Sequence, residues 1–100
     1  MRITYSRLAR HDLDEVWNRI AKESSSTEVA DRLLESIQNT CNRLRRSPYI
    51  GRKRDEDFGM GMRSHPSGNY IVFYKVKSGT VRVIRILHGK RDIPAILSEE

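Results

Sequence analysis

Residues 61–100 of this chain carry cationic and aromatic side chains within segments that otherwise look like buried strands. The set comprises Arg63, Lys75, Arg82, Arg85, His88 and Arg91, together with Tyr70 and Tyr74. Burying a charge costs free energy unless the charge is paired or binds a ligand, so these positions need a physical reason. One such reason is metal-independent RNA cleavage, which requires a general base, a general acid and cations that neutralise the phosphate. In that chemistry His88 and Tyr74 would transfer protons, while Arg82 and Arg85 would supply positive charge.

The alternation of side chains along a strand divides this set. Successive side chains point to opposite faces, so we expect Arg82 and His88 on one face and Arg85 on the other. Under the structural alternative, Arg82 and Arg85 are edge or ion-paired cations whose partners are the carboxylates of residues 55–57 or Asp92. Both interpretations stay open at the level of the sequence.

Length and composition limit the classes of function. One hundred residues predict a single domain over residues 1–100, and 37% hydrophobic with 32% charged residues is typical of a soluble globular protein. No apolar run is long enough to span a membrane and the N-terminus has no signal-peptide core, so we expect a cytoplasmic protein without membrane contact. Cys41 is the lone cysteine and cannot form an internal disulfide. The net charge of +6 favours an acidic partner.

Two amphipathic helices are expected in the N-terminal half. Ser6 can cap the first helix, with Asp12 and Arg19 on its outer face, and residues 25–28 match a capping box for the second, which ends near residues 47–48. The loop between the helices is short, so they should form an antiparallel hairpin. Their apolar faces comprise Ala9, Leu13, Val16, Trp17, Ile20 and Ala21 in the first helix and Ala30, Leu33, Leu34, Ile37, Cys41 and Leu44 in the second.

Four strands are expected around this hairpin. They cover residues 2–5, 62–65, 69–77 and 80–88, with turns at 66–69 and 78–79 and a charged connector at 48–61. The order is β-α-α-β-β-β. The predicted class is α+β, with the N-terminal helical hairpin packed on one face of an antiparallel sheet.

Metal and phosphate sites find no support in the sequence. The histidines His11, His65 and His88 are scattered, and no pair of them has the spacing of metal ligands. Gly59-Met-Gly61 precedes a strand rather than a helix, so it does not match a phosphate-binding loop. We therefore expect no metal and no cofactor.

Trp17 admits two interpretations. On its helix face it is either a core residue or an anchor for a protein partner, because Trp is enriched at interface hot spots. The hairpin also carries more apolar surface than one small sheet would cover. That surplus would leave a groove for a partner helix.

The chain resembles a known family along its whole length. The segments that carry the resemblance are residues 9–17 (ARHDLDEVW), 30–34 (ADRLL), 48–52 (PYIGR), 61–66 (GMRSHP), 70–74 (YIVFY) and 83–93 (VIRILHGKRDI). In this order they resemble the ParE-type toxins of the RelE/ParE superfamily, which belong to bacterial type II toxin–antitoxin systems.

The resemblance implies a toxin that inhibits DNA gyrase by binding to it, or to a gyrase–DNA complex, without catalysis. No catalytic residue is then expected, and the candidate target contacts are Arg63, Arg82, Arg85, His88 and Arg91. A ParD-like antitoxin with an acidic tail that folds on binding would cover the apolar hairpin. The candidate antitoxin contacts are Leu13, Trp17, Ile20, Leu33, Leu34 and Ile37. The oligomeric state, homodimer or heterotetramer with the antitoxin, stays open.

Two alternatives accompany this interpretation. The other branch of the superfamily contains RelE-like toxins that cleave mRNA on the ribosome without a metal, and here His88 and Tyr74 would be the proton-transfer groups. A third hypothesis is an inactive relative that only binds the antitoxin.

Overall fold

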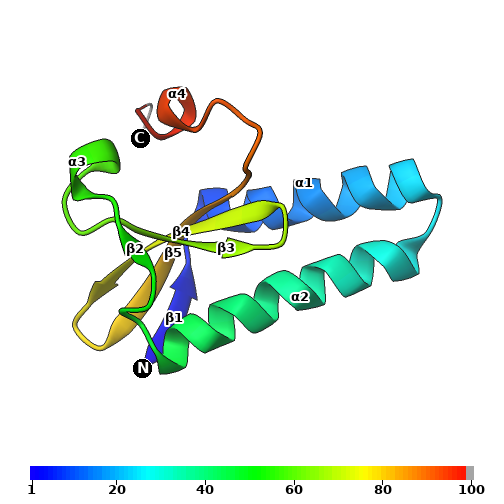
Figure 1. Cartoon of the computed structure of the whole chain (residues 1–100). Coiled ribbons are helices and arrows are strands. Elements are labelled where there is room, and N and C mark those ends of the chain that lie inside the picture. Colours follow the sequence, from blue (N-terminus) through cyan, green and yellow to red (C-terminus); the bar gives the residue numbers. More distant parts are fainter. Residues whose placement is uncertain (99–100) are drawn as a thin grey trace.

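A computed structural model describes residues 1–98 of the chain (Figure 1). Nine elements follow one another: β1 (Arg2–Tyr5), α1 (Arg7–Ser24), α2 (Thr27–Arg46), β2 (Arg52–Lys53), α3 (Asp55–Phe58), β3 (Arg63–Ser67), β4 (Tyr70–Lys77), β5 (Thr80–His88) and α4 (Ile93–Ser98). The strands form one sheet in the order β1-β5-β4-β3-β2. Within the described part of the chain, no helix combines the length and hydrophobicity that crossing a membrane requires.

Local capping signals define the helical hairpin of α1 and α2. The Ser6 side chain accepts a hydrogen bond from the Ala9 N–H at 2.9 Å, as predicted for the cap of α1. Ser25 ends α1 in the left-handed conformation, with φ of 55°. The N-cap of α2 is therefore Ser26, which accepts from the Val29 N–H, and the capping box predicted from residues 25–28 was placed one residue too early.

The sheet confirms the α+β class. Strands β3, β4 and β5 form the predicted antiparallel meander, and Ser78 and Gly79 join β4 to β5 with positive φ at both residues, as a two-residue hairpin requires. The first strand, β1, pairs parallel with β5, with Ile3 opposite Val81, so the sheet is antiparallel except at this edge.

Several boundaries differ from the predictions for physical reasons. The predicted strand 62–65 runs instead from Arg63 to Ser67, through Pro66. Proline is tolerated there because β2 pairs only with Arg63 and Ser64, so no ladder partner on that side needs the missing N–H. The connector 48–61 contains β2 and α3, and the apolar tail forms α4.

The sheet has an apolar cluster on each face. In β4 the side chains alternate, so Val72 and Tyr74 face the helical hairpin while Phe73 faces the opposite side. The helix-side cluster consists of Ala9, Val16, Ile37, Cys41, Leu44, Tyr70, Val72, Tyr74, Val81, Val83 and Ile86. The outer cluster consists of Met62, Phe73, Leu87, Ile93 and Leu97, from the sheet, α4 and the segment before β3.

A β-bulge changes which side chains of β5 share a face. Tyr74 pairs with Val83 and Phe73 pairs with Arg85, which leaves Ile84 as an extra residue in β5. Arg82 lies between two residues of the helix-side cluster and so points to the outer face, whereas His88 lies on the helix side, two residues after Ile86. The prediction that Arg82 and His88 share one face is therefore wrong.

Asp12 docks α1 against β5. Its carboxylate accepts hydrogen bonds from the Arg85 guanidinium at 2.8 and 2.9 Å and from the Ile86 N–H at 2.9 Å. Asp12 is only 4% exposed, so its predicted position on the outer face of the helix is wrong. The ion-pair alternative for Arg85 is confirmed, but the partner is Asp12 rather than the carboxylates of 55–57 or Asp92.

Replacing Asp12 should destabilise the fold. Asp12→Ala removes one partner of a buried ion pair and the acceptor of the Ile86 N–H, so we expect the free energy of unfolding to fall by about 3 kcal/mol. Asp14→Ala removes a carboxylate from an exposed position two residues away and should change it by less than about 0.5 kcal/mol. Urea denaturation of both variants measures the difference, and equal stabilities would contradict the docking role of Asp12.

Candidate functional site

Two adjoining cavities form a groove between α1 and the ends of β4 and β5. Their volumes are about 370 and about 470 Å³, and both are lined by Arg19, Tyr70 and His88. We call this the α1–β5 groove. The first cavity is further lined by Asp12, Glu15, Val16, Asn18, Lys22, Ile86 and Arg91, and the second by Ile20, Glu23, Leu33, Gly68 and Asn69.

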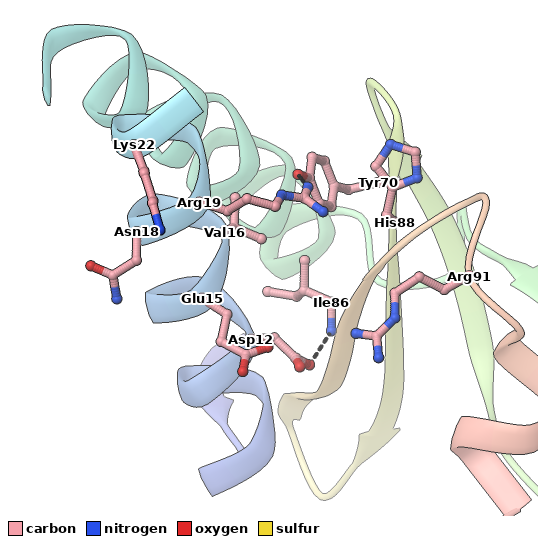
Figure 2. A pocket seen from close by; sticks show the side chains of 10 residues that line it. All are labelled: Asp12, Glu15, Val16, Asn18, Arg19, Lys22, Tyr70, Ile86, His88 and Arg91. Atoms are coloured by element: carbon pink, nitrogen blue, oxygen red, sulfur yellow. Dashed lines mark hydrogen bonds between the residues drawn. The ribbon is translucent and has the colours of Figure 1, made fainter. Parts of the chain in front are cut away.

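Helix α1, strands β4 and β5, and the loop after β5 place the polar side chains of the groove. Figure 2 shows Arg19 of α1 and His88 of β5 beside Tyr70, and Arg91 reaching from the loop after β5 toward the helix. Tyr70 begins β4 directly opposite His88, the last residue of β5. Arg19 and Lys22 are three residues apart, so they lie on the same side of α1.

Hydrogen bonds and a ring contact orient the centre of the groove. The Arg19 guanidinium donates to the Tyr70 hydroxyl, and the Tyr70 ring meets the His88 ring edge-on, with centroids 5.2 Å apart. The Lys90 N–H donates to Nδ1 of His88 at 3.1 Å. A neutral His88 ring therefore carries its proton on Nε2, so this nitrogen can donate a hydrogen bond to a ligand.

The cations of the groove lack acidic partners within the described part of the chain. No ion pair among residues 1–98 engages Arg19, Lys22 or Arg91. Of the carboxylates that line the first cavity, Asp12 binds Arg85 and Glu15 contacts His11 at 3.0 Å. Carboxylate or phosphate oxygens are the ligands that such cations and the His88 N–H bind most strongly.

The five predicted target contacts do not form one surface. His88 and Arg91 line the groove, whereas Arg85 is held by Asp12 with a side chain only 12% exposed. Arg82 lies near the start of β5 and donates to Thr4 Oγ1. Arg63 lies in β3, where its guanidinium donates to backbone carbonyls of the loop before β2. The structure therefore joins only His88 and Arg91.

Tyr74 is unsuited to the acid role in the nuclease alternative. Its side chain is fully buried, and its hydroxyl donates to the Pro48 carbonyl at 2.7 Å and accepts from the Gly51 N–H at 2.9 Å. Burial raises the pKa of Tyr74 above its ordinary value. It also lies four residues along β4 from Tyr70, the tyrosine that pairs with His88, so Tyr74 and His88 do not lie at one site.

The predicted antitoxin contacts divide in the same way. Ile37 is 1% exposed and belongs to the core, so it is not available to a partner. Ile20 and Leu33 line the second cavity of the groove. Leu13 and Leu34 pack partly buried against the helix-side cluster, and the indole N–H of Trp17 donates to Asp31 of α2 at 2.8 Å. The hairpin thus contributes Ile20 and Leu33 to the groove, rather than a continuous apolar face.

Arg19 and Lys22 are the groove residues that the sequence pattern did not reveal. Helical periodicity places Arg19 outside the apolar face, and Lys22 belongs to none of the predicted sets. They were not distinguishable from the other charges of α1 without the position of Tyr70, which is distant in sequence. Among residues 1–98, no group of three or more His, Cys, Asp or Glu side chains could hold a metal ion.

The fold is that of a small α+β protein, and comparison with known proteins gives its family. A profile of the family described as "ParE toxin of type II toxin-antitoxin system, parDE" matches residues 3–93. Toxin ParE1 of Caulobacter vibrioides is 35% identical over 92 residues, and Toxin ParE1 of Mycobacterium tuberculosis 31% over 93 residues; each match covers 92% of this chain and 93% of the relative. The chain therefore belongs to the ParE toxin family.

Solved structures share the fold. The chromosomal ParDE TA system from P. aeruginosa superposes with a TM-score of 0.76 at 20% identity, over 88% of this chain and 95% of that one. A YoeB/ParE toxin from Agrobacterium tumefaciens gives a TM-score of 0.60 at 21% identity, over 88% and 98%. At these identities the likeness concerns the fold alone.

The contact between Gly51 and Tyr74 yields a second prediction. A Cβ on Gly51 would overlap the Tyr74 hydroxyl and lie 2.7 Å from two ring carbons, so Gly51→Ala must displace a buried ring. We expect a loss of about 2 kcal/mol in the free energy of unfolding, as for other overpacked cores. Gly89→Ala is the matched control, because its Cβ would meet its nearest neighbour at 3.5 Å, an ordinary contact. Thermal unfolding compares the two, and equal midpoints would contradict the packing argument.

Proposed function

We propose that this toxin inhibits DNA gyrase by binding to it, and that a ParD-like antitoxin neutralises the toxin by occupying the α1–β5 groove. Membership of the ParE family supports an antitoxin as the partner. A target made of gyrase and DNA would place the toxin's action in the cytoplasm.

The composition of the groove carries the antitoxin part of the proposal. Arg19, Lys22 and Arg91 lie there without ionic partners among the described residues, beside the apolar side chains of Ile20 and Leu33. An acidic, amphipathic segment satisfies both features, because its carboxylates pair with the cations while its apolar side chains fill the second cavity. Cavities of this size accept side chains of a peptide rather than a folded domain.

Binding suits the groove better than catalysis. General acid–base cleavage of RNA needs two proton-transfer groups on opposite sides of a phosphate. The groove offers His88, but Tyr74, the predicted acid, is buried in the sheet. The tyrosine beside His88 is Tyr70, which is only 5% exposed and whose hydroxyl accepts a hydrogen bond from Arg19. An inhibitor that recognises its target by charge and shape needs no second proton-transfer group.

The groove also joins residues from both predicted sets. His88 and Arg91 come from the set assigned to the target, and Ile20 and Leu33 from the set assigned to the antitoxin. If both partners use the groove, they compete for it. Neutralisation then requires no conformational change in the toxin.

Truncating Arg91 tests the shared use of the groove. Arg91→Ala removes a charge-assisted contact from both complexes, so we expect gyrase inhibition and antitoxin affinity each to weaken about tenfold. Lys90→Ala removes a charge from the adjacent exposed residue, which does not line the groove, and should change either quantity less than about twofold. Supercoiling assays measure the first quantity, and titration calorimetry with the antitoxin measures the second.

Each part of the proposal can fail separately. Supercoiling that is unaffected by excess wild-type toxin would show that gyrase is not the target. If Arg91→Ala weakened only one of the two interactions, the partners would not share the groove.

A further inference from the structure

The loop between α2 and β2 is held rigidly at the opposite end of β4 from the groove. The Tyr74 hydroxyl bonds the Pro48 carbonyl at 2.7 Å and the Gly51 N–H at 2.9 Å. The Arg63 guanidinium donates to the carbonyls of Tyr49 at 3.3 Å and Gly51 at 2.9 Å. Because both anchoring side chains come from the central strands, the loop has a fixed shape.

This fixed loop displays two apolar side chains to solvent. Tyr49 is 64% exposed, and among the large hydrophobic side chains of residues 1–98 only Met60 is more exposed. Ile50 is 47% exposed, the same value as Met1. The Arg63 guanidinium lies against the Tyr49 ring, 5.0 Å from its centroid. One side of the ring is therefore supported by a cation, and the rest is open to a flat ligand.

Positive charge is concentrated in the sequence on both sides of Tyr49. Residues 36–54 include six Lys or Arg side chains and no acidic residue. Lys53 pairs directly opposite Arg63 in the β2–β3 ladder, where two like charges repel. Among residues 1–98, no ion pair engages Arg46, Lys53 or Arg63.

Part of this charge has a structural explanation. Arg46 ends α2, and cations at a helix C-terminus are stabilised by the helix dipole. That effect does not account for Lys53, which lies in a strand and faces another cation. An anionic ligand at Lys53 and Arg63 would relieve this repulsion, and Arg46 lies three residues before Tyr49 in the sequence.

We propose that Tyr49, with Arg46, Lys53 and Arg63, forms a binding surface for single-stranded nucleic acid. A base stacks on the open side of the Tyr49 ring, and the adjoining phosphates lie against the three cations. A nucleotide supplies a flat partner for the ring and an anion in one ligand, whereas an acidic peptide side chain supplies only the anion. The surface lies about 13 Å along β4 from Tyr70, so it is separate from the groove and does not rest on the proposed function.

Fluorescence anisotropy with a labelled oligothymidine of about twelve nucleotides tests this surface. We expect binding at low ionic strength that weakens as salt increases, because phosphate contacts release counterions. Tyr49→Ala should weaken binding about tenfold, and Tyr49→Phe, which keeps the stacking ring, less than about twofold. Tyr49→Leu keeps apolar volume without a ring and should behave like Tyr49→Ala.

Charge variants separate a defined surface from general attraction. Lys53→Ala should weaken binding and reduce the slope of log affinity against log salt by about 0.7. Arg32→Ala removes an exposed cation from the first half of α2 and should leave both quantities unchanged. Thermal unfolding of each variant confirms that the fold is intact.

Three outcomes would overturn the proposal. The first is the absence of binding by the wild-type chain at low salt. The second is an equal effect of Arg32→Ala and Lys53→Ala with no effect of Tyr49→Ala, which would indicate diffuse attraction. The third is displacement of the oligonucleotide by polyglutamate at matched charge, with the same dependence on Tyr49, which would assign the surface to an acidic protein.

Discussion

The carboxylate of Asp12 completes an edge of the sheet that β1 leaves open. β1 ends at Tyr5 while β5 continues to His88, so the far half of β5 has no strand on the side away from β4. Side chains of the first helix take over the role of that strand. Ser6 donates to the Ile84 carbonyl at 2.6 Å, and Asp12 accepts from the Ile86 N–H and holds Arg85. Because the carboxylate binds a backbone group and a guanidinium together, it fixes the rotation of α1 as well as its distance from the sheet.

The groove depends on this docking. Arg19 lies seven residues after Asp12, close to two helical turns, so both side chains project from the same side of α1 toward the sheet. Arg19 then reaches the Tyr70 hydroxyl, and Tyr70 packs against His88. The buried ion pair of Asp12 and the groove residue Arg19 thus lie about two turns apart on one helix. A change that loosens the ion pair therefore also moves the cations of the groove.

The parts of this fold that were predicted correctly have local causes. The Ser6 cap and the Ser78-Gly79 turn each depend on a few adjacent residues. Asp12 was placed in solvent because helical periodicity counts an isolated carboxylate as an outer residue, and its partner Arg85 is 73 residues away. The faces of β5 were misassigned because the extra residue Ile84 is visible only in the register with β4. Arg19 and Lys22 of the groove were missed for the same reason, since their place in a site depends on Tyr70, which is distant in sequence.

Two tyrosines of one strand organise the two ends of the molecule. Tyr70 and Tyr74 lie on the same face of β4, in the helix-side cluster, but their hydroxyls hold Arg19 at the groove and the Pro48–Gly51 loop at the other end. A ligand confined to the groove leaves the exposed Tyr49 ring uncovered. If one target engages both surfaces, each contact raises the effective concentration of the other, and the joint affinity exceeds either alone. An antitoxin that fills only the groove would then leave the target one weak contact with the toxin, at the Tyr49 surface. Such an antitoxin could neutralise the toxin without covering both surfaces.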